Sequence, residues 1–562
     1  MPTSFTTLAK LCERLESTTK RKDMVGAVAF FLLELDDEEV EPATLMLVSR
    51  ALPRWDQRVL EVSWATLNKT IREVTNAGNH VLSSAFAKTG DVGDAIKIIF
   101  ERGKTRRQAM LFQSQLTILE VRRTFEKIAE TIGARSREKK ERLLGTLLGS
   151  ATPLEAKYLT RILLKEMRTG FHEGLMEQAV AKAFNIPLEA VQTASMLTGD
   201  IGRVATLAKL EGKTGLLRVK FKIFRPIKPM LAQMTTAVAE VLTEHGGQTA
   251  LEYKLDGARV QIHKSRDTVK IFSRRLTEVT RSLPEIVQQV RSSVKAEKAI
   301  LEGEVIAVGK DGNPMPFQHL MRRFTRIREI QHALKEIPIQ LHLFDALYID
   351  GGSLINEPYN LRRQRLATVA GNIPLTKQIV TSDAETAEHF MKEAIKAGHE
   401  GLMAKKPDSP YTSGIRGKAW LKIKETLEPL DLVIVAAEYG YGRRHGWLSD
   451  YCLAARDTES GNLLQVGKTF KGLTDAEIIK MTEALEKSAI DKEGHRVIVS
   501  PKIIVEITYN EIQKSSIYKC GIALRFARIS RIRNDKNLEA VDSIQKIRKI
   551  YEEQFEKKAR YP

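Results

Sequence analysis

Hydrophobic and polar positions divide the chain into a helical first part and two later parts rich in strands. Up to about residue 225, apolar residues recur at intervals of three and four, as on the buried face of a helix. Residues 116–132 (LTILEVRRTFEKIAETI) follow this pattern and predict one helix. Residues 153–171 (PLEAKYLTRILLKEMRTGF) predict a second, which begins with proline and has glycine near its end.

The pattern changes around residues 225–234 (RPIKPMLAQM), where alternating and short apolar runs begin. Strands are predicted at 269–273, 299–308 and 339–350. A helical pattern at 384–398 interrupts them, which indicates a mixed α+β domain.

After about Thr426 a further β-rich region contains LDLVIVAAE, YCLAARD and KIIVEITYNEI, and a charged helix is predicted at 541–560. Short strands followed by a helix suit a small barrel with a helical tail. A chain of 562 residues also exceeds one hydrophobic core. We therefore expect a multidomain protein: an all-α domain at 1–225, an α+β domain at 226–426 and a β-barrel domain at 427–562.

Two segments of the helical part resemble each other, TGDVGDAIKI from Thr89 and TGDIGRVATLA from Thr198. A glycine turn that opens a helix presents backbone N–H groups, which can hold a phosphate. Two tight turns between packed helices would give the same pattern, so both interpretations stay open.

The net charge of +19 and pI of about 9.6 indicate a polyanionic partner. Nucleic acid is favoured over a membrane surface, because no basic amphipathic helix with a bulky apolar face stands out. Cys12, Cys452 and Cys520 are widely separated and form no disulfide framework, which favours a reducing compartment. Without an apolar run of about 18 residues or a signal-peptide core, we expect a cytoplasmic protein with no membrane part.

Familiar ATP-binding and zinc-protease patterns are absent. The sequence GKT occurs at Gly103 and at Gly212, but Ile98 and Leu207 stand where a P-loop needs glycine. Two His-Glu pairs also lack the second histidine of a zinc-protease helix. ATP chemistry would therefore need a different site.

The segment EYKLDGARVQIHK, residues 252–264, places Lys254 in a strand-like run before the turn Asp256-Gly257. A lysine must be neutral to act as a nucleophile, and Arg259, other cations and a bound metal would favour that form. A lysine beside an ordinary hairpin turn would look the same, so this segment does not decide alone.

KLDGAR resembles the first motif of the covalent nucleotidyltransferases, which include DNA ligases, RNA ligases and mRNA capping enzymes. The later motifs follow in order: SRRLTEVT from Ser273, LEGEV from Leu301, LFDALYID from Leu343, EGLMAK from Glu400, WLKIK from Trp420 and RFARISRIRNDK at 525–536. Glu302 stands where most relatives have aspartate. RPIKPMLAQM, the helical region and YGRRHGWLSDYCLAARD narrow the resemblance to archaeal and eukaryotic replicative ATP-dependent DNA ligases, over essentially the whole chain.

This resemblance implies a helical DNA-binding domain, a nucleotidyltransferase (adenylation) domain and an OB-fold. The activity it implies is the ATP-dependent sealing of nicks in duplex DNA during replication, repair and recombination. Lys254 would form a phosphoramidate with AMP, and the AMP would pass to the 5′-phosphate before the 3′-hydroxyl attacks. We expect a monomer.

The resemblance also implies roles for other residues. Glu252 would accept a hydrogen bond from the adenine amino group, Phe344 would stack on the base and Glu304 would hold the ribose. The phosphates would be contacted by a cationic set: Arg259 and Arg274 for the nucleotide or the nick's 5′-phosphate, Lys422 with Lys424 for the α-phosphate, and Arg416 before that motif. Glu304 and Glu400 suit Mg²⁺ or Mn²⁺, which prefer oxygen ligands.

Other enzyme and protein classes explain the sequence less well. An NAD-dependent ligase usually carries a four-cysteine zinc site, which three scattered cysteines cannot form. A capping enzyme or RNA ligase would not explain about 225 basic helical residues, where Lys165, Arg168 and Arg106 are candidates for DNA phosphates. A non-catalytic DNA clamp with a ligase fold is a further alternative.

Gln108–Phe112 (QAMLF) lies where archaeal relatives carry a sliding-clamp-binding peptide, although it has one aromatic residue instead of two. The start of an ordinary amphipathic helix would explain the segment equally well.

Overall fold

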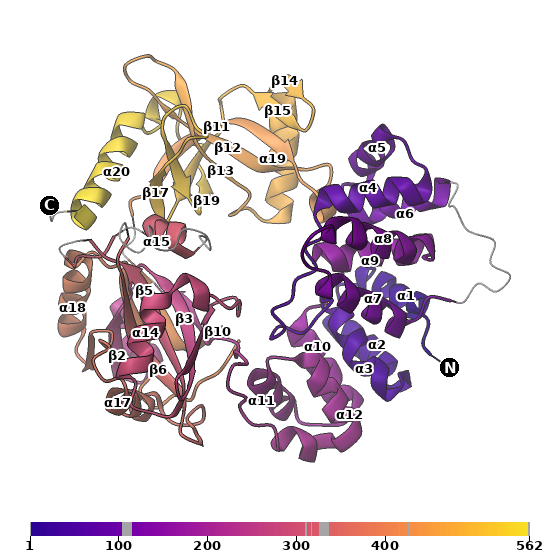
Figure 1. Ribbon diagram of the computed structural model, residues 1–562. Helices are drawn as coiled ribbons and strands as arrows, with labels where there is room; N and C mark the ends of the chain where they lie inside the picture. The colour runs from indigo at the N-terminus through magenta and orange to yellow at the C-terminus, as the bar shows by residue number, and fades with distance from the viewer. Residues whose placement is uncertain are drawn as a thin grey trace.

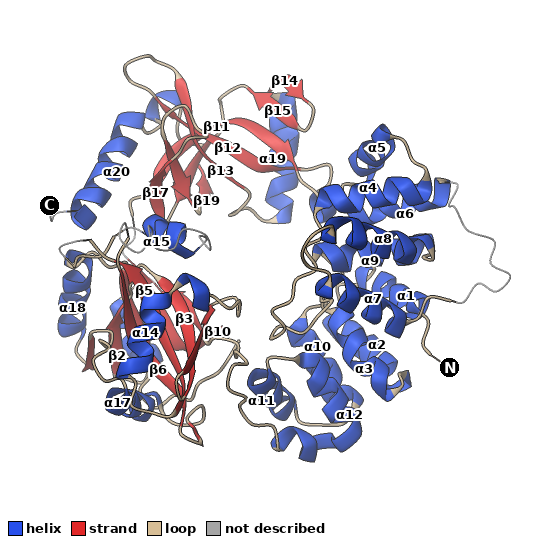
Figure 2. Ribbon diagram, viewed as in Figure 1, coloured by secondary structure: helices blue, strands red, loops and turns tan. Residues whose placement is uncertain are grey.

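The computed structural model describes residues 2–103, 115–235, 237–309, 312–315, 317–324, 337–414, 416–424 and 427–559. A helical part, a two-sheet part and a C-terminal strand-rich part follow one another along the chain (Figure 1). Helices make up the described N-terminal part, whereas helices and strands occur together in the other two parts, as the sequence pattern predicts (Figure 2). Among the described helices, none is both long and apolar enough to cross a membrane.

The N-terminal part is built from helices that bury one extensive core, in which Phe5, Phe125 and Tyr158 are fully buried. Capping boxes begin several helices; Thr117 and Glu120 exchange hydrogen bonds at one such start. The helices are α1 (Phe5–Glu16), α2 (Arg21–Glu34), α3 (Asp37–Leu47), α4 (Trp64–Thr75), α5 (Asn79–Thr89), α6 (Val92–Arg102), α7 (Ile118–Glu130), α8 (Ser136–Gly149), α9 (Pro153–Leu164), α10 (Glu173–Ala183), α11 (Leu188–Thr198) and α12 (Ile201–Leu217).

The predicted helix at 116–132 is confirmed as α7, but the one at 153–171 ends earlier than predicted. Helix α9 stops at Leu164, where Lys165 adopts a left-handed φ of 60°. The apolar pattern continues beyond this point because Met167 and Phe171, which belong to the loop after the helix, are also buried.

Both TGD segments form the same turn between two helices. Each glycine, Gly90 or Gly199, ends a helix with a positive φ, and each aspartate, Asp91 or Asp200, caps the next helix through a backbone N–H. The second glycine of each segment permits close packing: a Cβ at Gly93 would lie 2.5 Å from the Arg161 side chain.

The middle part contains two five-stranded sheets, and the predicted strands and helix of this region are confirmed. One sheet has the order β1 (Leu231–Thr235), β10 (Arg416–Lys424), β9 (Gly401–Lys405), β2 (Thr249–Tyr253), β8 (Gln378–Thr381). The other has the order β4 (Thr268–Ser273), β3 (Ala258–Ser265), β5 (Lys298–Ala307), β6 (Ile339–Ile349), β7 (Gly352–Ser353). The helices are α13 (Val238–Glu244), α14 (Pro284–Ser293), α15 (Phe317–Phe324), α17 (Tyr359–Val369) and α18 (Ala384–Lys396).

The C-terminal part is rich in strands and ends in helix α20 (Ile544–Ala559), as predicted. Its main sheet has the order β13 (Leu463–Thr469), β12 (Leu448–Arg456), β11 (Leu430–Tyr439), β15 (Arg496–Val499), β14 (Ala489–Glu493), and β16 (Ile504–Thr508) joins β11 to β19 (Arg528–Ile532). A hairpin of β17 (Glu511–Lys514) and β18 (Ile522–Arg525) packs against β13, and α19 (Asp475–Lys487) covers β12. The hydrogen-bonded ladder among the described strands is not closed, and the arrangement is compatible with the predicted OB-fold.

The three parts contact one another in a circuit (Figure 1). The helical part reaches the middle part through an ion pair of Lys228 with Glu173, at 2.8 Å. The C-terminal part returns to the helical part where the Gly442 N–H donates to the Gly90 carbonyl at 3.0 Å. Next to this bond the rings of Phe86 and Tyr441 lie 5.6 Å apart.

Candidate active site

Lys254 lies where the chain crosses from one sheet of the middle part to the other. Strand β2 ends at Tyr253, and β3 begins at Ala258 in the second sheet. The turn is therefore not a hairpin, which removes the ordinary-hairpin interpretation of Lys254. A Cβ at Gly257 would collide with the Val305 carbonyl, so this close crossing requires glycine.

The Lys254 side chain pairs with the carboxylate of Glu400. Lys424 reaches the same carboxylate at 2.8 Å, and the three side chains are each about one-fifth exposed. Burial disfavours the charged form of Glu400, but Lys254 and Lys424 lower its pKa to about 2. The carboxylate is therefore ionised at neutral pH and shared between two ammonium groups.

Arg259, which the sequence predicts to favour the neutral form of Lys254, is held by a carboxylate and a main-chain carbonyl. Its guanidinium donates to the Glu302 carboxylate at 2.6 Å and to the Met230 carbonyl at 2.7 Å. Residue 259 stands opposite Glu304 in the β3–β5 ladder and diagonally to Glu302, whose buried carboxylate binds it. Arg259 still borders the predicted base site, 5.3 Å from the centre of the Phe344 ring.

Glu304 lies on β5, and the charges of Lys254, Glu400 and Asp256 affect its pKa. Its pKa is raised to about 7, mainly by burial and also by Glu400 and Asp256, although the charges of Lys254 and Arg259 oppose the rise. Within the described ranges, no three Asp, Glu, His or Cys side chains form a ready-made metal site. Two carboxylates fit Mg²⁺, which keeps several waters and also binds substrate phosphates.

Glu252, on β2, and Phe344, on β6, come together at a buried network. Glu252 accepts hydrogen bonds from Gln378 at 3.0 Å, from the Tyr359 hydroxyl and from Lys405 at 2.7 Å. The Lys405 ammonium also lies 4.5 Å from the centre of the Phe344 ring. Sequence reasoning missed Lys405, although it is the last residue of the EGLMAK motif.

The remaining predicted cations lie on or next to the same sheets. Lys422 and Lys424 are separated by one residue on β10, so both project from the same face of that strand. Arg274 directly follows β4. Arg416 is the first residue of β10, and its side chain lies outside the described residues, as do Arg106 and the segment Gln108–Phe112 in their entirety.

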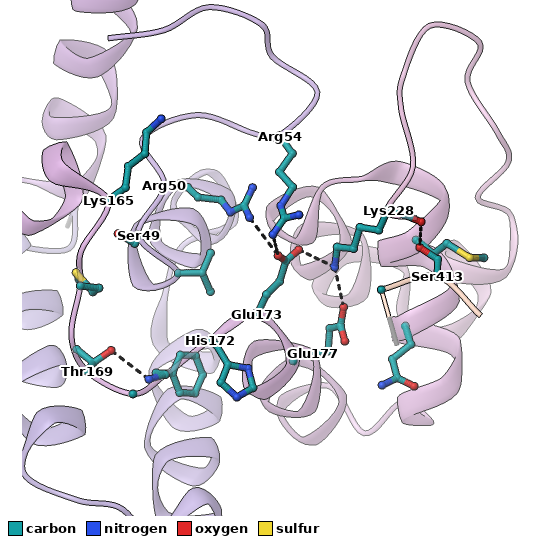
Figure 3. A pocket seen from close by; sticks show the side chains of 18 of the residues that line it. Ser49, Arg50, Arg54, Lys165, Thr169, His172, Glu173, Glu177, Lys228 and Ser413 are labelled. Carbon is teal, nitrogen blue, oxygen red and sulfur yellow. Dashed lines mark hydrogen bonds and ion pairs between the residues drawn. The ribbon is translucent and has the colours of Figure 1, made fainter. Parts of the chain in front are cut away.

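A hollow of about 890 Å³ separates the helical part from the middle part (Figure 3). Its cations include Lys165 and Arg168, which the sequence proposed for DNA phosphates, and Arg274. On one wall Glu173 binds two arginines and Lys228, while Lys165 extends away from that cluster (Figure 3). The side chains lining the hollow are Arg50, Arg54, Lys165, Arg168, His172, Glu173, Glu177, Lys228, Arg274 and Ser413, among others.

Three family models match successive stretches of the chain. Residues 4–181 match "DNA ligase N terminus", residues 229–424 match "ATP dependent DNA ligase domain", and residues 444–536 match "ATP dependent DNA ligase C terminal region". The middle match contains Lys254 and the carboxylates Glu252, Glu302, Glu304 and Glu400, whereas RNA-ligase and capping-enzyme alternatives would not account for the other two matches.

Full-length relatives agree. The DNA ligase of Thermococcus onnurineus (strain NA1) is 44% identical over 99% of both chains, and DNA ligase 1 of Korarchaeum cryptofilum (strain OPF8) is 46% identical over 98% of both. A solved structure, Pmar-Lig_PreS3, shares the fold with a TM-score of 0.56 at 18% identity, over 94% of this chain and 99% of that one. With three successive family matches and archaeal relatives along its full length, the chain belongs to the ATP-dependent DNA ligases.

Proposed function

We propose that this protein seals nicks in duplex DNA with ATP, through an AMP adduct on Lys254, in replication, repair and recombination. The observation that carries the proposal is the position of Lys254 at the crossing between two sheets, in contact with Glu400 and near Glu304. Membership of the ATP-dependent DNA ligases supports the same activity.

In the first step, the Lys254 amine attacks the α-phosphorus of ATP. A nitrogen–phosphorus bond forms, the bond to the pyrophosphate oxygen breaks, and the ammonium proton is released to solvent. For this step Lys254 must leave Glu400. Lys424 already binds Glu400 at 2.8 Å, so the carboxylate keeps a cationic partner when Lys254 turns away. Lys422 and Lys424 would then neutralise the α-phosphate, because phosphoryl transfer depends mainly on charge and alignment.

In the second step, a 5′-phosphate oxygen of the nick attacks the adenylate phosphorus and displaces Lys254. In the third, the 3′-hydroxyl attacks the activated 5′-phosphate, the sealing bond forms, and AMP leaves. Arg274 lies beside the cation-lined hollow and would contact the 5′-phosphate.

The nucleotide would be held by Glu252 at the adenine amino group, by Phe344 at the base and by Glu304 at the ribose. Arg259, 5.3 Å from the Phe344 ring centre, would support that side of the pocket, and Arg416 the phosphates. Glu304 and Glu400 would hold Mg²⁺ or Mn²⁺, which supplies positive charge for the developing phosphate negative charge.

DNA would contact the hollow through Lys165 and Arg168, consistent with the net charge of +19. Phosphate binding by the turns at Gly90 and Gly199 stays a prediction, and the Gly90 turn already contacts Gly442. A sliding clamp bound through Gln108–Phe112, a monomeric state and a cytoplasmic location are likewise carried as predictions.

Incubation with ATP labelled at the α-phosphate tests the proposal. Lys254→Ala should take no label, whereas Lys418→Ala should keep it, because Lys418 lies on β10 but pairs with exposed Glu244, away from the site. Absence of stable label on the unmodified protein, with Mg²⁺ and with Mn²⁺, would favour a non-catalytic clamp. Parallel reactions with GTP and NAD identify the cofactor, and nicked DNA against nicked RNA identifies the substrate.

A further inference from the structure

A single buried ammonium contacts both groups assigned to the adenine base. Lys405 is about 1% exposed, and its Nζ lies 2.7 Å from Glu252 Oε2. The same Nζ stands 4.5 Å from the ring centre of Phe344, 4.6 Å from that of Tyr359 and 4.5 Å from that of Trp420. Three aromatic faces and one carboxylate therefore enclose the charge, as in other recognition sites for cations.

Strand register builds this enclosure. Lys405, on β9, stands directly opposite Trp420 on β10. Glu252, on β2, stands opposite Met403, so Lys405 is its diagonal neighbour on the same face of the sheet. Tyr359, at the start of α17, is fully buried against Glu252. The position of Lys405 is thus determined by the pairing of β9 with β10 and with β2.

Every partner of Glu252 in this network is a donor. The Tyr359 hydroxyl and Gln378 Nε2 donate to Oε1, and Lys405 donates to Oε2. Arg363 adds a second positive charge, with Nη1 at 3.5 Å from Oε1. With donors on both oxygens, this carboxylate is fixed in place and presents acceptor lone pairs to a ligand.

We propose that Lys405 is a positioning residue that sets base specificity, by fixing Glu252 as a hydrogen-bond acceptor and supporting the Phe344 ring. This inference rests on the proposed function of the site. Adenine presents an amino donor at position 6, which the carboxylate accepts. Hypoxanthine presents an oxygen there, and two acceptors face each other unfavourably.

Removal of the ammonium has a specific consequence. In Lys405→Met, Oε2 of Glu252 would lose its donor, and the carboxylate would no longer be fixed as the acceptor for the adenine amino group. The site would then discriminate less well between the amino group of adenine and the oxygen of hypoxanthine. The variant should therefore bind ATP less well and ITP relatively better.

The test measures protein labelling over a range of concentrations of ATP and of ITP, each labelled at the α-phosphate. The ratio of the two half-saturating concentrations is read from one preparation, so it does not depend on the folded fraction. The unmodified protein should prefer ATP, and Lys405→Met should lower that preference about 10- to 100-fold. Lys406→Met is the matched control, because the neighbouring Lys406 is partly exposed and pairs with Asp408 instead.

An unchanged ratio in Lys405→Met, including an equal loss with both nucleotides, would overturn the inference. If that variant takes no label from either nucleotide, Lys405→Arg decides, since it keeps the charge beside Glu252. If the ratio for Lys405→Arg is near that of the unmodified protein, the inference is supported. If Lys405→Arg no longer prefers ATP over ITP, the inference is contradicted. Failure of the unmodified protein to take label from any nucleotide would refute the proposed function instead.

Discussion

The Glu400 N–H donates to the Lys254 carbonyl at 3.0 Å, and the side chains of the same two residues form an ion pair. The main-chain bond, together with that from the Lys254 N–H to the Gly401 carbonyl at 2.8 Å, fixes one residue relative to the other. Lys254, the proposed nucleophile, is therefore held against a carboxylate that it must leave for the first step.

Glu400→Gln should slow labelling of Lys254 by about 10²- to 10³-fold, because an amide binds a divalent cation less well than a carboxylate does. Labelling rates measured over a range of Mg²⁺ concentrations check this prediction. Glu393→Gln, which alters an exposed carboxylate on α18, is the control and should behave as the unmodified protein. A Glu400→Gln rate within threefold of normal would contradict the role.

Glu304 predicts a pH dependence of the first step. Burial raises its pKa to about 7, so the carboxylate that would hold the ribose and metal becomes ionised as the pH rises through about 7. Labelling should increase over this range, and Glu304→Gln should remove the inflection. A flat profile for the unmodified protein between about pH 6 and 8 would count against the assignment.

The same group affects stability in the opposite direction. The folded state retains a proton on Glu304 that the unfolded state loses above about pH 4.5, so stability falls as the pH rises from about 4.5 to 7. The loss attributable to this group is about 3 kcal/mol. Urea unfolding at both ends of this range should show a smaller pH effect for Glu304→Gln.

Gly90→Ala should impair nick sealing but leave Lys254 labelling unchanged. A Cβ at Gly90 would collide with the His445 ring, in the contact between the helical and C-terminal parts. Gly133→Ala is the matched control, since Gly133 has a φ of 85° and a Cβ there would meet nothing within 4 Å. Both changes impose about 1–2 kcal/mol of backbone strain. The two variants should therefore unfold at similar temperatures, whereas only Gly90→Ala should seal nicks more slowly.

Glu173→Gln should weaken the junction between the helical and middle parts. Burial opposes its ionisation, yet Lys228, Arg54 and Arg50 lower the pKa of this carboxyl. Without the carboxylate, Lys228, Arg54 and Arg50 would repel one another. The free energy of unfolding should therefore fall by about 3 kcal/mol. Glu166→Gln, which alters an exposed carboxylate in the same hollow, should change stability little; equal losses in both variants would argue against the junction.

Much of the fold could be predicted because most elements have one apolar face. The runs that form β4, β5, β6 and α18 each carry their own periodicity. The end of α9 could not be predicted, since Met167 and Phe171 extend its apolar spacing but are buried from a loop. Whether a buried residue lies on a helix or beside one depends on tertiary packing.

The site was predictable in its members but not in their pairings. The motif order identifies Lys254, Glu400 and Glu304, yet Lys254 and Glu400 are 146 positions apart. The pairing of Arg259 with Glu302 follows from the ladder register, which the motif order does not reveal. Lys405 could not be found from the sequence, because an enclosure by three rings requires three separate strands and helices to meet.

The closed circuit of contacts also determines how a long duplex could enter it. Two of its three junctions are crossed by the polypeptide itself, between α12 and β1 and between β10 and β11, so the chain still spans the gap if the contacts there open. The junction of Gly90 with Gly442 has no such covalent link. If a duplex with no nearby end lies inside the circuit, it can enter sideways only at that junction, and its release requires the same junction to open again.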